Sequence, residues 1–135
     1  MKNGFLILFL ALTGLLLSTG ATYAELVIIG NQDLKIDSLT KKQLKQVFLG
    51  RTSTVGMEKI ELVDCSALQD QFLSKYLGKS LKSYNKIWIK KIFAEGATPP
   101  VNLKDVNEVI DYVRSTKNAI GYVDSAPADV KVLLK

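Results

Sequence analysis

The sequence contains no histidine and a single cysteine, Cys65. The first absence excludes the Ser-His and Cys-His catalytic pairs and the usual zinc ligand sets. With one thiol, the chain has no internal disulfide, so its stability must come from packing. The carboxylates Glu58, Glu61, Asp64 and Asp70 have no spacing typical of metal ligation or of an acid-base pair. We therefore expect a non-enzymatic protein with no metal and no cofactor.

The sequence carries only a modest excess of positive charge. The full chain carries a formal charge of +5, and the part after residue 24 carries +4, because Lys2 is the only charged residue before that point. This balance permits an anionic ligand or an acidic partner without demanding one, and we expect no nucleic-acid partner. Two interpretations remain open for the lysines at 75, 79, 82, 86, 90 and 91. They form a solvated face, or they form a surface for an anion or a partner.

The first 24 residues have the layout of a secretory signal peptide. Lys2 gives a basic start, Phe5 to Leu17 is almost wholly apolar, and a stretch of small residues ends at Ala24. This order predicts cleavage before Glu25 and export, most simply to a periplasm. The alternative is a membrane anchor, but the apolar run is shorter than the ~20 residues that a spanning helix needs. We expect a signal peptide over 1–24, one domain over 25–135, and no membrane span after cleavage.

The rest of the chain alternates between strand and helix patterns. We predict strands over 26–29, 59–63, 119–123 and 130–134, and helices over 39–49, from Asp64 or Ser66 to Leu77, from Ser80 to Phe93, and over 105–114. The segment 51–57 is predicted to be a loop. This alternation predicts an α/β domain with an at least partly parallel sheet.

Four residues carry specific structural expectations. Phe72 and Trp88 lie on apolar helical stripes, so both are predicted to be core residues; the alternative for Trp88 is a ligand platform. Cys65 follows an apolar run and is predicted to be a buried thiol at a strand end, with a reactive thiol as the alternative. Gly121 lies within a predicted strand, which suggests the close approach of another backbone or a positive φ.

Several short segments, taken in order, resemble a known family. They are Val47-Phe48-Leu49-Gly50, Val63-Asp64-Cys65-Ser66 before a helix with Phe72, Trp88 with Ile92-Phe93 and Gly96 before Pro99-Pro100, Glu108-Val109-Ile110, Tyr112-Val113, and Ala119-Ile120-Gly121-Tyr122-Val123. Together they are similar to small, single-lobe relatives of phosphate ABC-transporter substrate-binding proteins. The resemblance implies a three-layer α/β lobe like one domain of a type II periplasmic binding protein, with a mixed sheet flanked by helices.

The resemblance also implies a place for a ligand. In the family, an Arg and a Ser-Gly-Thr turn at a helix start hold phosphate. Aligning the family's phenylalanine on Phe72 puts Ser66, Ala67 and Leu68 at that turn and Leu62 near the arginine. One hydroxyl survives, so any remaining anion site is expected at Ser66 and the N–H groups of Ala67 and Leu68. Thr52 or Thr54 is expected to add a hydroxyl.

These expectations lead to two hypotheses of function. The first is an exported, non-enzymatic solute-binding-like protein with weak or lost affinity for phosphate or another small anion, since one lobe leaves a ligand open to water. The second is a periplasmic structural or protein-interaction module that keeps the lobe as a scaffold and binds a periplasmic or membrane protein. A homodimer would be another way to supply a second wall.

Overall fold

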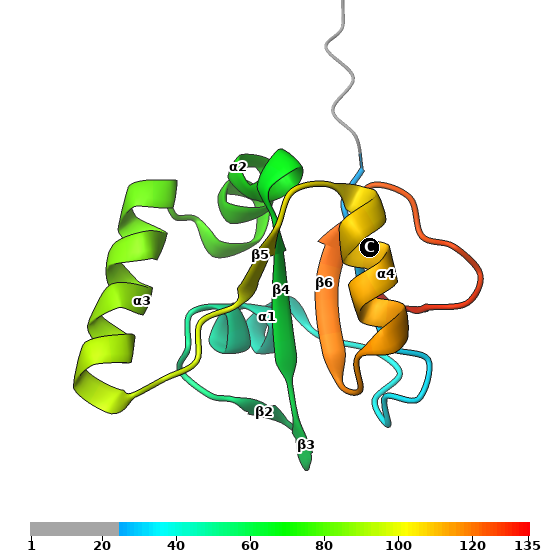
Figure 1. Cartoon of the computed structure of the whole chain (residues 1–135), viewed down its shortest axis with the longest axis horizontal. Coiled ribbons are helices and arrows are strands. Elements are labelled where there is room, and N and C mark those ends of the chain that lie inside the picture. The colour runs from blue at the N-terminus through cyan, green and yellow to red at the C-terminus, as the bar shows by residue number, and fades with distance from the viewer. Residues whose placement is uncertain (1–24) are drawn as a thin grey trace, which may run out of the picture.

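The computed structural model describes residues 25–135 (Figure 1). The predicted signal peptide over 1–24 lies outside the described residues. The elements, in chain order, are β1 (Val27–Gly30), α1 (Lys41–Phe48), β2 (Thr54–Val55), β3 (Glu58–Lys59), β4 (Glu61–Cys65), the 3-10 turn η2 (Ser66–Leu68), α2 (Gln69–Phe72), the π-helical turn η3 (Leu73–Leu77), α3 (Leu81–Glu95), β5 (Val101–Leu103), α4 (Val106–Ser115), β6 (Ala119–Val123) and β7 (Lys131–Leu134).

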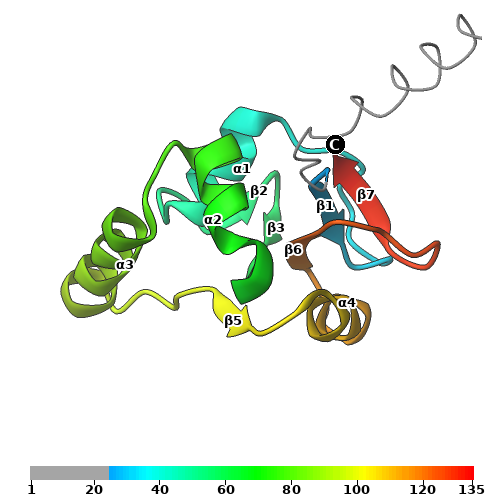
Figure 2. The ribbon, with the colours of Figure 1, turned by 90° about the horizontal axis from the view of Figure 1, so that it is seen from above.

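Five of the strands form one mixed sheet in the order β5-β4-β6-β1-β7. Strand β4 is parallel to both β5 and β6, whereas β1 is antiparallel to β6 and β7. The predicted α/β fold with a mixed sheet is therefore confirmed. In Figure 2, α1 and α2 cover one face of this sheet and α4 covers the other, which gives three layers. Helix α3 stands apart at one end of the molecule.

An aromatic cluster forms the centre of the core. Phe72 is fully buried and stacks on Tyr122 of β6, with ring centroids 3.9 Å apart and an interplanar angle of 4°. Phe48 of α1 meets the edge of the Phe72 ring at 4.8 Å. The prediction that Phe72 is a core residue is confirmed, and the helical segment from Gln69 to Leu77 is fixed to the sheet through it.

Helix α3 is attached to the lobe through two buried side chains, Tyr84 and Trp88. The Tyr84 hydroxyl donates a hydrogen bond to Asp64 at 2.7 Å, and the Trp88 Nε1–H donates to the Phe48 carbonyl oxygen at 3.0 Å. Trp88 is thus a core residue, as predicted. Ile92 and Phe93, which the sequence pattern places in the same helix, are exposed. Apolar residues occur on two sides of this helix, and only one side packs on the lobe.

Local signals place most helix ends correctly. Thr40 and Gln43 form a capping box at the start of α1, Ser80 caps α3, and Gly78 ends the preceding helical segment with a φ of 61°. The expected cap at Asp64 or Ser66 is absent, since the residue before η2 is Cys65 and no side chain caps that turn. Asp64 instead lies inside β4 with its side chain buried.

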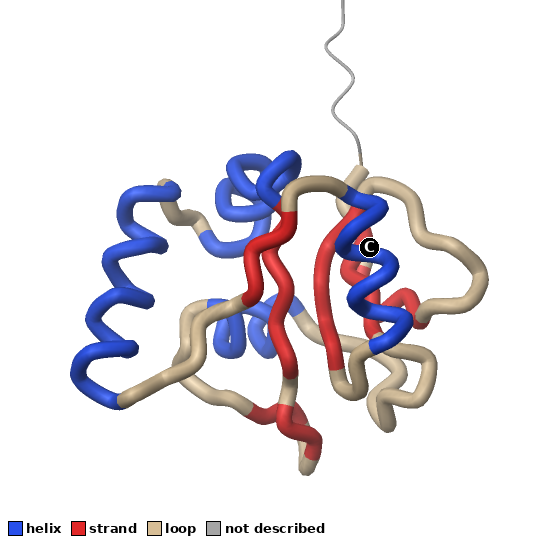
Figure 3. The backbone as a smooth tube through the Cα atoms, viewed as in Figure 1, coloured by secondary structure: helices blue, strands red, loops and turns tan. Residues whose placement is uncertain are grey.

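Three further details differ from the sequence prediction. The segment expected to be a loop contains β2, which pairs with β3 in a small hairpin just before β4 (Figure 3). Strand β5, a short edge strand, was not predicted. Gly121 has no positive φ, and the three atoms nearest to a Cβ placed there belong to side chains rather than to another backbone. A Cβ at Gly121 would lie 3.0 Å from Val109 Cγ1 of α4, so the glycine lets that helix pack closely on the sheet.

Within residues 25–135, no helix is both long and apolar enough to cross a bilayer.

Candidate functional site

The segment predicted to bind an anion lies where β4 ends. Ser66 begins η2 directly after Cys65, the last residue of β4. The carboxyl ends of parallel strands meet at one edge of a sheet, and ligands of open α/β folds bind outside that edge. The ends of β4, β5 and β6 therefore define the candidate site, which we call the carboxyl edge. It comprises Ser66 to Leu68, Asn102 to Asp105, and Asp124 with Ser125.

Two of the hydrogen-bond donors proposed for an anion already have partners in the chain. The Ser66 hydroxyl donates to Asn102 Oδ1 at 2.7 Å. The Ala67 N–H donates to the Lys104 carbonyl oxygen at 3.2 Å. Both bonds connect the end of β4 to the end of β5. An anion at this edge would have to replace these contacts before it could use the same donors.

The buried thiol of Cys65 lies behind the same turn. Burial raises the pKa of the Cys65 thiol, whereas hydrogen bonds from the Leu68 and Ala67 N–H groups lower it by a smaller amount. Those two N–H groups therefore face the sulfur, in addition to the Ala67 bond described above. The sequence prediction of a buried thiol at a strand end is confirmed. A thiol with a raised pKa carries little thiolate and is a poor nucleophile.

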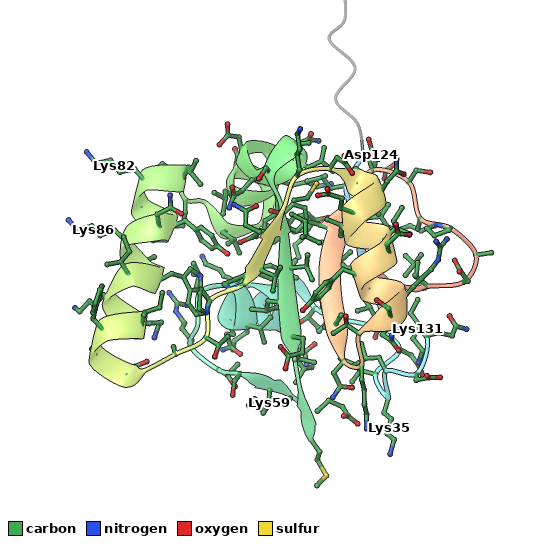
Figure 4. The ribbon with its side chains drawn as sticks, in the orientation of Figure 1. Lys35, Lys59, Lys82, Lys86, Asp124 and Lys131 are labelled. Carbon is green, nitrogen blue, oxygen red and sulfur yellow. The ribbon has the colours of Figure 1, made fainter. Side chains whose placement is uncertain are left out.

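Carboxylates outnumber cations at the carboxyl edge. Asp105 caps α4 by accepting the Glu108 N–H at 3.0 Å, and Glu108 in turn accepts the Lys104 N–H at 2.8 Å. Asp124 follows β6 and is exposed (Figure 4). The charges of Asp105 and Asp124 both raise the pKa of the Cys65 thiol, which places them close to the turn. Among the residues that define the edge, the two carboxylates Asp105 and Asp124 stand against one cation, Lys104, and Glu108 adds a third carboxylate beside them.

A buried carboxylate, that of Asp64, lies one residue before the end of β4. Asp64 is 3% exposed and accepts hydrogen bonds from the Tyr84 hydroxyl at 2.7 Å and the Tyr122 hydroxyl at 3.0 Å. Burial raises the pKa of the Asp64 carboxyl to about 6, although the two tyrosine hydrogen bonds oppose the rise. Burial and the adjacent Asp64 charge raise the pKa of both tyrosines. The trio joins α3, β4 and β6 in the interior.

Sequence reasoning missed this role of Asp64. The sequence pattern predicts Asp64 only as a possible start of the helix that ends at Leu77. The available signal was its position, since Asp64 lies between the apolar residues Val63 and Cys65 near the end of β4. A carboxylate in such a position must find buried donors.

The structure does not bring Thr52 and Thr54 to Ser66. The two threonines hydrogen-bond to each other through their hydroxyls and the Thr54 N–H, beside the β2–β3 hairpin. That hairpin precedes the first residue of β4, whereas Ser66 follows its last residue, so the groups lie at opposite ends of the strand (Figure 1). Thr52 instead lines a cleft of about 620 Å³ with Arg51, Lys59 and Trp88.

No metal site is evident in the part of the chain that the structure describes, where no group of three or more His, Cys, Asp or Glu side chains could hold an ion.

Comparison with known proteins finds solved structures with a similar fold. The sequence matches no family model and no curated protein sequence. A protein from Clostridium perfringens assigned as a phosphate ABC transporter substrate-binding protein, solved with bound phosphate, is similar with a TM-score of 0.64 and 17% identity, over 80% of this chain and 43% of that one. An ABC-type phosphate transport receptor from Vibrio cholerae is similar with a TM-score of 0.52 and 16% identity, over 80% of this chain and 44% of that one. PstS from Borrelia burgdorferi is similar with a TM-score of 0.56 and 20% identity, over 81% of this chain and 46% of that one.

These similarities confirm the fold that the sequence resemblance implied. The chain spans less than half the length of each of these structures. At 16–20% identity, the likeness shows a common architecture: one α/β lobe of the kind that builds phosphate ABC-transporter substrate-binding proteins.

Proposed function

We propose that this protein is an exported, non-enzymatic, solute-binding-like protein whose affinity for phosphate is weak or lost. The fold supports the solute-binding part of this proposal. The observation that supports weak or lost phosphate affinity is the hydrogen bonding and charge of the carboxyl edge. The Ser66 hydroxyl and the Ala67 N–H donate within the chain, and Asp105 and Asp124 lie close to the same turn. A phosphate dianion at this edge would find both donors already engaged and would be repelled by the negative charge of the nearby carboxylates.

The magnitude of the loss can be bounded. A hydrogen bond to a charged group contributes roughly 1.5–3 kcal/mol, so the absence of the family's arginine weakens binding about ten- to a hundred-fold. The described residues form one wall, so a phosphate on it also remains in contact with water, where charge-assisted bonds are weaker. We expect a dissociation constant on the order of millimolar or weaker, which corresponds to only ~4 kcal/mol.

Phosphate titration followed by amide chemical shifts tests this proposal. The expected result is weak, incomplete saturation in the millimolar range, with any specific shifts at Ser66 to Leu68. Asp124→Asn removes an exposed carboxylate at the edge and should strengthen binding several-fold, because it lowers repulsion. Asp33→Asn removes an exposed carboxylate in the β1–α1 connection and serves as the matched control. Micromolar affinity, or shifts centred away from Ser66 to Leu68, would contradict the proposal.

Export is the second part of the proposal, and the order of residues 1–24 supports it. Protein recovered from cells that express the full chain should lie in the periplasmic or secreted fraction. N-terminal sequencing of that material should begin at Glu25 or within a few residues of it. An intact Met1 on membrane-bound protein would contradict cleavage.

An alternative function is a structural or protein-interaction module. The observation that favours it is the pair of bonds from Ser66 and Ala67 to β5, which gives those groups a role in holding the edge strand. If this alternative holds, tens of millimolar phosphate should leave the melting temperature unchanged. Binding with millimolar affinity would raise the melting temperature measurably at the same phosphate concentration.

A further inference from the structure

Helix α3 exposes a second side that combines apolar and basic residues. Ile89 is 55% exposed and Phe93 is 86% exposed, and their spacing of four places them on the same side of the helix. Lys82, Lys86 and Lys90 follow the same spacing and flank them. We call these five residues the outer face of α3. Figure 4 shows Lys82 and Lys86 pointing away from the lobe.

Packing within the lobe does not explain this face. The opposite side of α3 already anchors the helix through Tyr84 and Trp88. Within residues 25–135, none of the three lysines of the outer face forms an ion pair; the pair made by α3 joins Lys91 to Glu95 at 3.6 Å. A large exposed aromatic ring beside unpaired cations is typical of an interaction surface.

Charge decides which occupant fits. A second copy docked on this face would bring its own lysines against these lysines, and like charges across an interface disfavour association. A bilayer with anionic headgroups offers the opposite charge to all three lysines at once. Its interfacial region can also accept the Phe93 ring and the Ile89 side chain while the lysines stay at headgroup level.

Shape supports the same occupant. Helix α3 forms one end of the long axis of the molecule (Figures 1 and 2), and Lys82 and Lys86 of its outer face point away from the lobe (Figure 4). A convex helix at an end can lie flat on a planar surface without a clash from the sheet or from α4. We propose that the outer face of α3 docks this protein on the surface of an anionic phospholipid bilayer.

Vesicle co-sedimentation tests the proposal with protein recovered from cells that express the full chain. Vesicles of phosphatidylglycerol and phosphatidylcholine in equal parts should bind it, and vesicles of phosphatidylcholine alone should not. Rising salt should release it, because surface charges are screened. All variants keep the same N-terminal segment, so differences among them report on α3.

The variants separate the two parts of the face. Each lysine near an anionic surface strengthens binding roughly five-fold, so Lys82→Glu with Lys86→Glu should weaken binding at least about twenty-fold. Phe93→Ser should weaken it about ten-fold through lost insertion. Lys35→Glu with Lys42→Glu changes net charge equally at exposed sites away from α3 and is the matched control, expected to have a much smaller effect. Thermal unfolding should show that every variant folds, since these side chains are exposed.

Three results would overturn the proposal. The first is no binding of the unaltered protein to the anionic vesicles. The second is equal loss of binding in the α3 pair and the control pair, which would indicate non-specific attraction. The third is a dimer in sedimentation velocity that Phe93→Ser dissociates, which would assign the face to a second copy.

Discussion

Replacing Phe72 with alanine is expected to lower the free energy of unfolding by about 3–5 kcal/mol. The ring is fully buried, stacks on Tyr122 at 3.9 Å and meets Phe48 at 4.8 Å. The substitution would lose the burial of the ring, leave a cavity between α2 and the sheet, and remove aromatic contacts that add ~0.5–1.5 kcal/mol per pair. A domain of this size has only ~5–15 kcal/mol in total, so the variant would be badly weakened.

Urea unfolding of the purified variant measures this effect, and the chain offers a matched control. Phe93→Ala makes the same chemical change at a ring that is 86% exposed, so it should change stability by less than ~0.5 kcal/mol. Equal losses for the two substitutions would mean that the aromatic cluster is not the centre of the core.

The second large effect concerns pH and Asp64. The unfolded carboxyl titrates near 3.8, whereas the folded one titrates at about 6 because it is buried. A raised folded pKa means that the protonated form stabilises the fold. The contribution of Asp64 to stability is therefore complete below pH 3.8 and is lost as pH rises through 6. The difference corresponds to about 3 kcal/mol, since one pKa unit is about 1.4 kcal/mol.

Asp64→Asn should remove this pH dependence. The amide stays neutral, accepts a hydrogen bond from one tyrosine and donates one to the other. The stability of the variant relative to the unaltered protein should rise by about 2–3 kcal/mol between pH 4 and pH 7, measured by urea unfolding across that range. Asp33→Asn, which changes an exposed carboxylate, should give no such rise. If Asp64→Asn and the unaltered protein have parallel pH profiles, Asp64 does not titrate as proposed.

Local signals in the sequence were enough for most elements of the fold. Thr40, Ser80, Gly78 and Gly96 mark helix ends through short-range caps, and the structure has each of these ends within two residues of the predicted bound. Helix α3 shows where such signals fail. Its apolar residues occur on two sides, so periodicity alone could not tell which side packs on the lobe. The outcome depends on Tyr84 and Trp88 finding partners in β4 and α1.

The position of Ser66 at a strand end was predictable from the sequence, but its hydrogen-bond partners were not. The sequence placed Ser66 at a strand end, and the structure has it there. The partners of Ser66 and Ala67 come from the β5 region, 36 positions along the chain in the case of Ser66 to Asn102. Asp64 likewise meets Tyr84 and Tyr122, which lie 20 and 58 positions away. Only the folded sheet reveals such distant pairs, and they decide whether a donor is free for a ligand.

The two-point attachment of α3 has a consequence for how the protein opens. The aromatic cluster of Phe48, Phe72 and Tyr122 joins α1, α2 and β6, and none of its three rings comes from α3. Breaking the contacts of Tyr84 and Trp88 would therefore release α3 while most of the core stays intact. We therefore expect residues 79–100 to behave as a separate cooperative unit of lower local stability, with amide hydrogens that exchange with solvent through partial opening rather than through global unfolding.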